Sequence, residues 1–297
     1  MFMGECVLLQ AEKKFSFMKL KILFAGILAV TLLTGCNEYN RVIKSGDAFY
    51  KFEAAKEYYV RGQYNRAAML LNEVLPALRG TEAGEEALFM HGMATLKAKD
   101  YEAAATILRK YYTDYPKGHF AEQAQYFCGV ALYESTPEVK LDQTATYDAV
   151  TELNRFVERW PRSELASDAR NKIFELQDKL VEKEWLSAKL YYDLGSYFGN
   201  CYTGGNNYQA CITTAENALR DFPYTKRRED FALLILRAKF DLADQSIPAK
   251  KQERLADAFE EYQNFIDEFP ESAGRKSADQ LFSKYKRQGN QPVAEAE

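Results

Sequence analysis

Apolar side chains recur along residues 85–116 at the three- and four-residue spacing of an amphipathic α-helix. The pattern breaks once, at residues 99–100, and so predicts two short helices joined by a tight turn. Gly92 lies in the first helix, at a point where a second helix would have to approach closely. Tyr101 begins the second helix, and Pro116 follows its end because a proline cannot continue a helix. We therefore predict a helix hairpin for this stretch.

The second helix of this hairpin recurs along the chain. In each of four copies an aromatic–proline pair ends the helix, and the proline lies fourteen or fifteen positions after the tyrosine or leucine that begins it. A further copy begins at Tyr64 and ends near Gly80 without such a pair, as a terminal repeat often does. The four pairs are Tyr115-Pro116, Trp160-Pro161, Phe222-Pro223 and Phe269-Pro270.

This pattern resembles the tetratricopeptide repeat, a helix–turn–helix unit of roughly 34 residues. We expect an all-α fold, namely a right-handed helical solenoid of about five tetratricopeptide-like helix hairpins plus a C-terminal capping helix. The fourth hairpin is expected to begin with a long helix that ends near Gly195 or Gly199. The expected parts are a signal peptide at 1–35, an extended lipidated tether at 36–45, repeats one to three at 46–161, repeats four and five with the capping helix at 162–287, and a disordered tail at 288–297.

The N-terminal segment is predicted to be a targeting signal. Its apolar run, residues 22–33, is about a dozen residues long, fewer than the roughly 20 that span a bilayer. Met18 begins a conventional signal by itself, so we interpret residues 1–17 as a mis-assigned upstream start. The sequence Leu33-Thr34-Gly35-Cys36 resembles a bacterial lipobox, in which cleavage precedes the cysteine and its sulfur carries diacylglycerol. The alternative is an ordinary signal whose cysteine is incidental.

The residue after Cys36 bears on where such a lipoprotein would reside. It is Asn37, whereas Asp at this position is the usual cue for retention in the inner membrane. The lipobox resemblance therefore implies a lipid-anchored protein on the periplasmic side of the outer membrane.

Composition limits the classes of function. Hydrophobic residues make up 47% of the chain and aromatic residues 14%, so a packed core is expected rather than disorder. The net charge of −4 argues against non-specific binding to nucleic acid. The two histidines, His91 and His119, fall in different repeats, and the motifs of phosphate-binding loops, dinucleotide sites and serine hydrolases are missing from the sequence. We therefore expect no enzymatic activity, no metal and no cofactor.

Three cysteines of the repeats need separate interpretations. Cys128 lies on an apolar helical face, where a buried free thiol is ordinary. Cys201 and Cys211 flank a glycine- and asparagine-rich turn, and they could form a disulfide in an oxidising compartment. Cys211 also occupies the small-residue position of its helix, so the alternative is a packed residue that forms no disulfide.

Several segments outside the generic repeat carry a closer resemblance. They are the tether Cys36-Asn-Glu-Tyr-Asn, residues 53–64, the insertion at 141–146, the long helix with Leu176 and Tyr191-Tyr192, and the closing residues 265–272. On these segments the chain is similar to BamD-type lipoproteins of the outer-membrane β-barrel assembly (BAM) complex, particularly those of the Bacteroidetes. The stretch 196–207 is longer than this family pattern leads us to expect. The resemblance implies a non-enzymatic scaffold that binds the POTRA domains of the BamA-type barrel subunit and unfolded outer-membrane proteins.

Aligned first helices of repeats one to three predict a peptide-binding groove. With Ala55, Gly92 and Gly129 as equivalent positions, helical spacing places a set of mainly aromatic side chains on one face. That face would suit an extended peptide with an aromatic end, whereas the alternative is that these side chains form the core between repeats. The predicted groove residues are Phe49, Phe52, Lys56, Tyr59, Phe89, Met93, Leu96, Tyr126 and Tyr133.

A second candidate surface is the basic cluster Lys226, Arg227 and Arg228. It is either a solvated helix start or a docking site for an acidic POTRA surface. At the level of the whole protein, the alternative to the BAM complex is a repeat adaptor of another envelope complex, for example one that coordinates peptidoglycan synthesis. A periplasmic hydrolase would need a cluster of acids or metal ligands that the sequence does not show.

Overall fold

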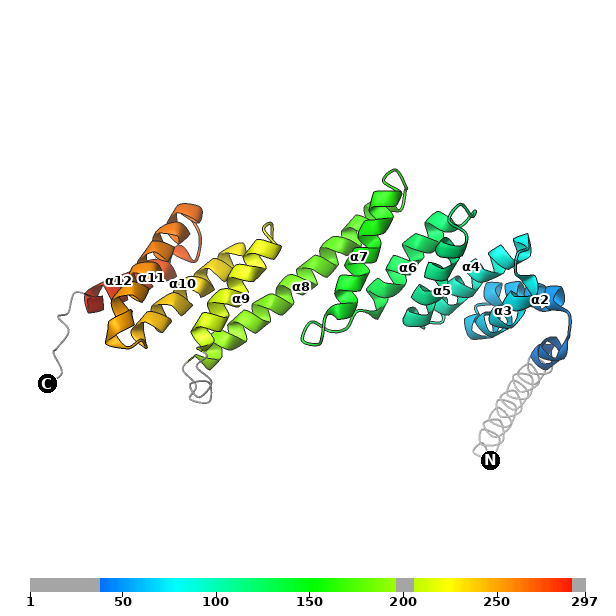
Figure 1. The fold of residues 1–297 in the computed structure, drawn as a ribbon, viewed down its shortest axis with the longest axis horizontal. Helices are drawn as coiled ribbons and strands as arrows, with labels where there is room; N and C mark the ends of the chain where they lie inside the picture. Colours follow the sequence, from blue (N-terminus) through cyan, green and yellow to red (C-terminus); the bar gives the residue numbers. More distant parts are fainter. Residues whose placement is uncertain (1–37, 196–205, 290–297) are drawn as a thin grey trace, which may run out of the picture. The chain divides into compact units, whose positions relative to one another are not determined.

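The computed structural model describes residues 38–195 and 206–289, and every regular element within these two ranges is a helix (Figure 1). The predicted all-α repeat fold is therefore confirmed, while its handedness stays a prediction. The chain divides after Ala131 into two compact units. Four predicted features lie outside the described residues: the signal peptide, the lipidation site Cys36, Cys201 and residues 290–297 of the tail.

Unit 1 consists of consecutive antiparallel helix hairpins. Helix α2 packs against α3, α3 against α4, and α4 against α5. Its core includes Phe52, Leu70, Leu71 and Leu108, each at most 2% exposed. The helices of this unit are α2 (Ala48–Val60), α3 (Tyr64–Leu78), α4 (Glu82–Lys97), α5 (Tyr101–Asp114) and the larger part of α6 (Ala121–Ser135).

The segment expected to be an extended tether is helical where it is described. Residues 38–44 form a helix, in which Val42 is only 3% exposed. The ring of Tyr39 packs edge-on against Tyr58 of α2, with 5.4 Å between the ring centroids. Burial of these side chains against α2 accounts for the helix, since so short a segment is not stable as a helix by itself.

Unit 2 continues the hairpins, and each helix from α7 to α12 packs against the next. The predicted division between residues 161 and 162 falls inside this unit. The observed division lies earlier because the long helix α8 is tied to the end of α6. Lys179 of α8 donates a hydrogen bond to Thr136 Oγ1 (2.9 Å), and Tyr133 bonds Glu175. The helices are α7 (Thr144–Arg159), α8 (Ala166–Leu194), α9 (Asn207–Asp221), α10 (Arg228–Asp244), α11 (Pro248–Glu268) and α12 (Arg275–Gly289).

Helix ends agree closely with the predicted breaks. The long helix α8 ends at Leu194, followed by Gly195 with φ +46°, as predicted. Helix α11 begins at Pro248, because proline is well suited to the first turn of a helix. The predicted capping helix is α12, whose Tyr285 is 1% exposed and stacks on Phe240 at 4.8 Å.

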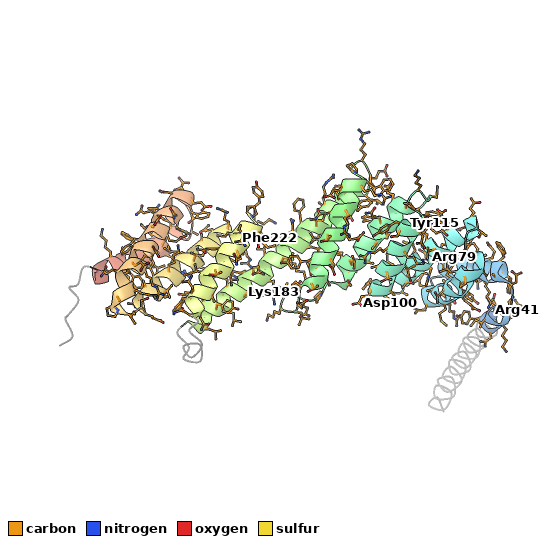
Figure 2. All side chains as sticks on the ribbon, in the orientation of Figure 1. Arg41, Arg79, Asp100, Tyr115, Lys183 and Phe222 are labelled. Atoms are coloured by element: carbon orange, nitrogen blue, oxygen red, sulfur yellow. The ribbon has the colours of Figure 1, made fainter. Side chains whose placement is uncertain are left out.

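The four aromatic–proline pairs mark equivalent corners. Each aromatic residue follows the last residue of its helix, with φ between −124° and −128° and ψ between 58° and 66°. Its N–H donates to the carbonyl four residues earlier, and its own carbonyl accepts from the N–H three residues later. Figure 2 labels two of these aromatic residues, Tyr115 and Phe222. The repeat predicted from sequence is thus confirmed by geometry.

Candidate functional site

The first helices of repeats one and two, α2 and α4, are joined by a lysine. Lys56 Nζ lies 3.0 Å from Glu53 on its own helix and 3.3 Å from Glu86 on α4. The same ammonium group lies 4.1 Å from the ring centroid of Phe52. Burial alone would lower the pKa of Lys56, but the hydrogen bonds to the two carboxylates outweigh it and the pKa is raised. Lys56 therefore stays charged and holds the two helices in register.

The predicted groove residues differ in exposure, and three of them belong to the core. Phe52 is 2% exposed, Tyr126 7% and Leu96 9%. The groove interpretation is thus wrong for these three side chains, because neighbouring helices cover them. Phe49 is 59% exposed, and Lys56, Tyr59, Phe89, Met93 and Tyr133 are half-buried.

Phe89 lies in an aromatic cluster at the next corner. Its ring stacks on Phe120 with 4.5 Å between centroids and an angle of 3° between planes. It also meets the fully buried Tyr111 edge-on at 5.7 Å. Phe89 therefore mainly stabilises the joint between α4, α5 and the start of α6.

Tyr133 belongs to unit 2, apart from the other groove residues. Its hydroxyl donates to Glu175 of α8, and Lys172 Nζ lies 5.1 Å from its ring. The hydrogen bond to Glu175, together with burial, raises the pKa of Tyr133 to about 12. The candidate binding surface that remains lies within unit 1. We call it the α2–α4 face, and it consists of Phe49, Lys56, Tyr59, Glu86 and Met93.

The basic cluster of unit 2 is largely paired within the unit. Arg227 Nη2 lies 2.5 Å from Glu182, and its guanidinium lies 5.3 Å from the ring of Trp185. Arg228 pairs with Glu268. Lys226 differs, because its side chain is 91% exposed and its contact with Asp178 is 3.6 Å. Of the three, Lys226 is the residue best placed to meet a partner.

Two carboxylates that sequence reasoning missed hold the corners. Glu85 of α4 accepts hydrogen bonds from Tyr111 Oη (2.5 Å) and His119 N (2.9 Å). Glu229 of α10 accepts from Gly274 N (3.0 Å) after α11. Both are acidic residues in the first turn of their helix, and that position is the only signal the sequence carries. Burial, followed by the bond to Glu85, raises the pKa of Tyr111, so its hydroxyl stays a donor.

The insertion between α6 and α7 is organised by another residue that sequence reasoning did not single out. The Gln143 side chain is buried, and its Nε2 donates to the carbonyls of Glu138 (2.8 Å) and Leu141 (3.0 Å). Its Oε1 accepts from Thr146 Oγ1 at 2.7 Å. Lys183 of α8 donates to the Lys140 carbonyl at 2.9 Å. The insertion is thus a fixed part of unit 2.

The cysteines of the described chain are buried thiols. Cys128 and Cys211 are both 0% exposed, and the Cys128 thiol donates to the Ala105 carbonyl at 3.3 Å. Burial raises the pKa of Cys211 to about 12, so that thiol is a poor nucleophile. Its alternative partner, Cys201, lies outside the described residues. Cys211 therefore fits the interpretation as a packed small residue.

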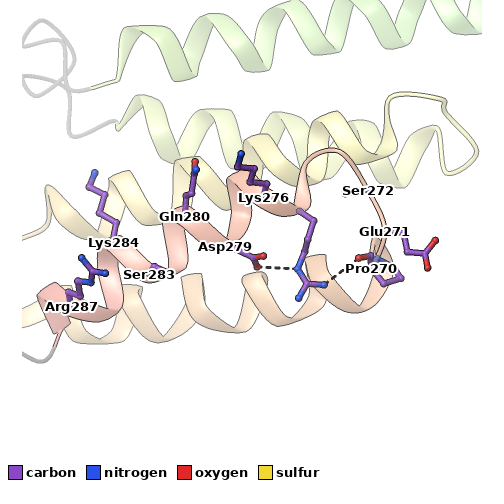
Figure 3. A pocket seen from close by; sticks show the side chains of 10 residues that line it. Pro270, Glu271, Ser272, Lys276, Asp279, Gln280, Ser283, Lys284 and Arg287 are labelled. Carbon is purple, nitrogen blue, oxygen red and sulfur yellow. Dashed lines mark hydrogen bonds and ion pairs between the residues drawn. The ribbon is translucent and has the colours of Figure 1, made fainter.

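The outer side of the capping helix is polar. A hollow of about 880 Å³ runs along α12, and Figure 3 shows the side chains that line it. Arg275 Nε donates to Asp279 Oδ1 there at 3.0 Å, and Lys276 and Lys284 extend from the same helix. A polar outer face is what the last helix of a repeat array requires.

Catalytic chemistry has few candidates in the described chain. His91 is partly buried, and this burial lowers its pKa to about 4. Its buried Nδ1 atom has no hydrogen-bond partner among the described residues. Within the described ranges, no cluster of three or more His, Cys, Asp or Glu side chains could hold a metal ion. Among the described helices, none combines the length and the apolar character needed to cross a membrane.

Comparison with known proteins places these features in context. The model of the YfiO family, described as an outer membrane lipoprotein, matches residues 44–203, which is more than half of the chain. "Outer membrane protein assembly factor BamD" of Caulobacter vibrioides is 30% identical over 131 residues, covering 44% of this chain and 43% of the relative. The Rickettsia prowazekii protein of the same name is 24% identical over 129 residues, covering 43% and 51%. The chain thus spans about half the length of these relatives.

Two solved structures were also found to be similar. Both are described as nearly identical TPR-like repeats of Podosopora anserina. The first has a TM-score of 0.35 at 12% identity and covers 77% of this chain and all of its own. The second has a TM-score of 0.31 at 16% identity and covers 80% of this chain and 95% of its own.

Proposed function

Because the chain belongs to the YfiO family of outer membrane lipoproteins, we propose that it is a non-enzymatic scaffold for the assembly of β-barrel proteins in the outer membrane. The observation that carries this proposal is the match of its repeats to two assembly factors named BamD. The chemistry agrees, because buried thiols, paired carboxylates and a neutral buried histidine suit packing better than catalysis.

The proposed partner is the BamA-type barrel subunit, bound through its POTRA domains. Lys226 supports a contact with an acidic surface, since its side chain is 91% exposed. Arg227 and Arg228 contribute by holding the start of α10 in place through their own ion pairs. A single exposed charge changes the rate of association and its salt dependence more than it changes affinity.

The proposed substrates are unfolded outer-membrane proteins, held at the α2–α4 face. Phe49 offers an exposed aromatic ring there, and Met93 offers a half-buried, adaptable side chain. The Lys56–Glu86 pair offers both charges beside them. Burial of one exposed aromatic ring against a peptide is worth about 1.5–3 kcal/mol, so binding at this face alone would be weak and reversible.

The proposed location is the periplasmic side of the outer membrane, with Cys36 as the lipidated residue. This is supported by the lipobox-like sequence before Cys36 and by membership of a family of outer membrane lipoproteins. Intact-mass measurement of the mature protein tests it, since lipidation adds a diacylglycerol to a chain that begins at Cys36.

Binding to purified POTRA domains of the barrel subunit from the same bacterium tests the proposal. We expect a measurable Kd that rises with salt, and association of Lys226→Glu slowed several-fold. Lys117→Glu serves as the matched control, because Lys117 is an exposed lysine in unit 1. Absence of binding by the wild-type chain would overturn the proposal. Recovery of a different envelope complex without the barrel subunit would favour the adaptor alternative.

A further inference from the structure

A basic hollow of about 610 Å³ lies between the turn of the first hairpin and the turn of the second. We propose that it docks an anionic lipid headgroup of the membrane that carries the protein. The inference rests on the proposed lipidation of Cys36 and adds a second contact between this chain and the bilayer. The hollow is lined by Gly62, Gln63, Tyr64, Asn65 and Arg66 of the first hairpin and by Lys97, Ala98 and Lys99 of the second.

The lining has the chemistry that a phosphate group requires. Arg66, Lys97 and Lys99 provide three cations, and the amide groups of Gln63 and Asn65 provide further donors. Lys97 and Lys99 are exposed, and neither forms an ion pair with another described residue. The hollow therefore presents net positive charge to whatever lies in front of it.

Nearby carboxylates are occupied by other contacts. Asp100 caps α5 by accepting from Ala103 N at 3.4 Å. Glu57 and Glu38 both pair with Arg61, at 3.2 and 3.8 Å. The lining of the hollow itself contains three cations and no carboxylate.

The N-terminal helix, which begins two residues after Cys36, contacts a side chain of this hollow. The guanidinium of Arg66 lies 4.9 Å from the ring centroid of Tyr39, so one side chain both lines the hollow and contacts the N-terminal helix. Tyr39 follows Cys36 by three residues, and three residues span at most about 11 Å between Cα atoms. A diacylglycerol on Cys36 would therefore place the bilayer surface within reach of the hollow.

The hairpin turns that form the hollow lie along the same edge of unit 1 as the N-terminal helix. In Figure 2, Arg41 and Asp100 are labelled along the lower edge of unit 1, whereas Tyr115 is labelled along its upper edge. The hairpin turns that form the hollow thus share an edge with the N-terminal helix, and the aromatic–proline corner lies at the opposite edge. If Cys36 is in the membrane, the basic edge faces it.

A solvated turn with no ligand is the competing explanation. Lys97 would then act only on the C-terminal end of α4, where a positive charge is favourable. The two explanations differ in one measurable respect, because only docking shields Lys97 and Lys99 from solvent when an anionic bilayer is present.

Lysine acetylation of the full-length lipidated protein, read by mass spectrometry, makes this measurement. The protein is reconstituted in phosphatidylcholine vesicles with or without phosphatidylglycerol, and inorganic phosphate is added in a third sample. We expect labelling of Lys97 and Lys99 to fall at least fivefold in the anionic vesicles only, since one lysine near an anionic surface changes affinity by about this factor. Lys117, exposed beside the Tyr115 corner, is the internal control and should not change.

Equal labelling of Lys97, Lys99 and Lys117 in anionic vesicles would overturn the proposal. Protection by inorganic phosphate without protection by vesicles would overturn it too, because the hollow would then hold a free anion. Failure of the proposed lipidation gives a different result, namely no added diacylglycerol in the intact mass and no retention on vesicles.

Matched variants complete the test. The double variant Lys97→Gln with Lys99→Gln should weaken sedimentation of the unlipidated Cys36→Ser chain with anionic vesicles by tenfold or more. The control, Arg79→Gln with Lys117→Gln, removes the same charge from the opposite edge and should leave sedimentation unchanged. Equal losses in both double variants would show non-specific attraction and contradict a site.

Discussion

Phe49 and Phe52 lie one helical turn apart on α2 in opposite surroundings. Phe49 is 59% exposed and Phe52 is 2% exposed. Helical spacing puts both on one side of the helix, so their separation into surface and core could not be predicted from the sequence. It depends on how α3 and α4 pack against α2, which is a property of tertiary structure.

This contrast gives a prediction for the α2–α4 face. Phe52→Ala should lower the free energy of unfolding by about 3–5 kcal/mol, because it leaves a cavity in the core. Phe49→Ala should change stability by less than about 0.5 kcal/mol and weaken the binding of unfolded barrel peptides. Urea unfolding and peptide titration of the two variants measure both effects. Stable folding of Phe52→Ala with normal unfolding would contradict the core assignment.

We predict that the free energy of unfolding depends on pH through His91. Its pKa is lowered by burial from 6.5 to about 4, so between these values the unfolded chain binds more protons than the folded chain. Above pH 6.5 the contribution of His91 to the free energy of unfolding is fully present. As the pH falls this contribution is lost, and at pH 5 the loss is about 2 kcal/mol.

The measurement is urea unfolding at pH 7 and pH 5 for the wild type and for His91→Leu. The loss between the two pH values should be smaller by about 2 kcal/mol in the variant, since leucine does not titrate. His119→Leu is the control, because His119 is exposed. An identical loss in His91→Leu and the wild type would show that His91 is not the cause.

Among the elements, the hairpin corners could be predicted well from the sequence. The aromatic–proline pairs identify them because proline ends the helix by a local effect that needs no tertiary contact. The helix at residues 38–44 could not be predicted, since it exists through contacts of Tyr39 and Val42 with unit 1. The role of Gln143 could not be predicted from the sequence either, because a buried amide that bonds three carbonyls has no sequence pattern of its own.

The close approach of α4 and α5 was predicted from Gly92 and is confirmed. A Cβ atom at this position would lie 2.6 Å from Leu108 Cγ and Cδ2, and Leu108 is 0% exposed. Gly92→Ala should therefore destabilise unit 1 by about 1–3 kcal/mol despite the better helix propensity of alanine. Gly46→Ala, where nothing lies within 4 Å, should be close to neutral in the same thermal unfolding experiment. A stabilised Gly92→Ala variant would show that the helices have room to move apart.

The corner after α5 depends on the Tyr111 hydroxyl. It donates to Glu85 and accepts from Phe120 N at 3.1 Å. Tyr111→Phe should lower the free energy of unfolding by about 1–3 kcal/mol, because Glu85 and the Phe120 N–H both lose a partly buried hydrogen bond. Tyr50→Phe removes a hydroxyl from a residue that is 40% exposed and should cost far less. Equal costs in chemical denaturation would argue against the corner as a hydrogen-bonded joint.

For the whole molecule, the sequence predicted a boundary between repeats three and four, at residues 161 and 162, whereas the structure divides after Ala131. The reason is the set of hydrogen bonds between α8 and residues 133–140, which no repeat pattern encodes. The α2–α4 face and the basic hollow both lie in unit 1, and Lys226 lies in unit 2. Substrate and membrane contacts are thus proposed for one unit and the barrel subunit for the other.

The most direct test of a role in barrel assembly is depletion of the protein in the bacterium that carries it, with quantitative proteomics of the outer membrane. We predict that many unrelated β-barrel proteins fall together, while lipid-anchored proteins of the same membrane keep their levels. A plasmid copy of the wild-type gene should restore the barrels. Unchanged barrel levels after complete depletion would contradict the scaffold function, whatever else the protein binds.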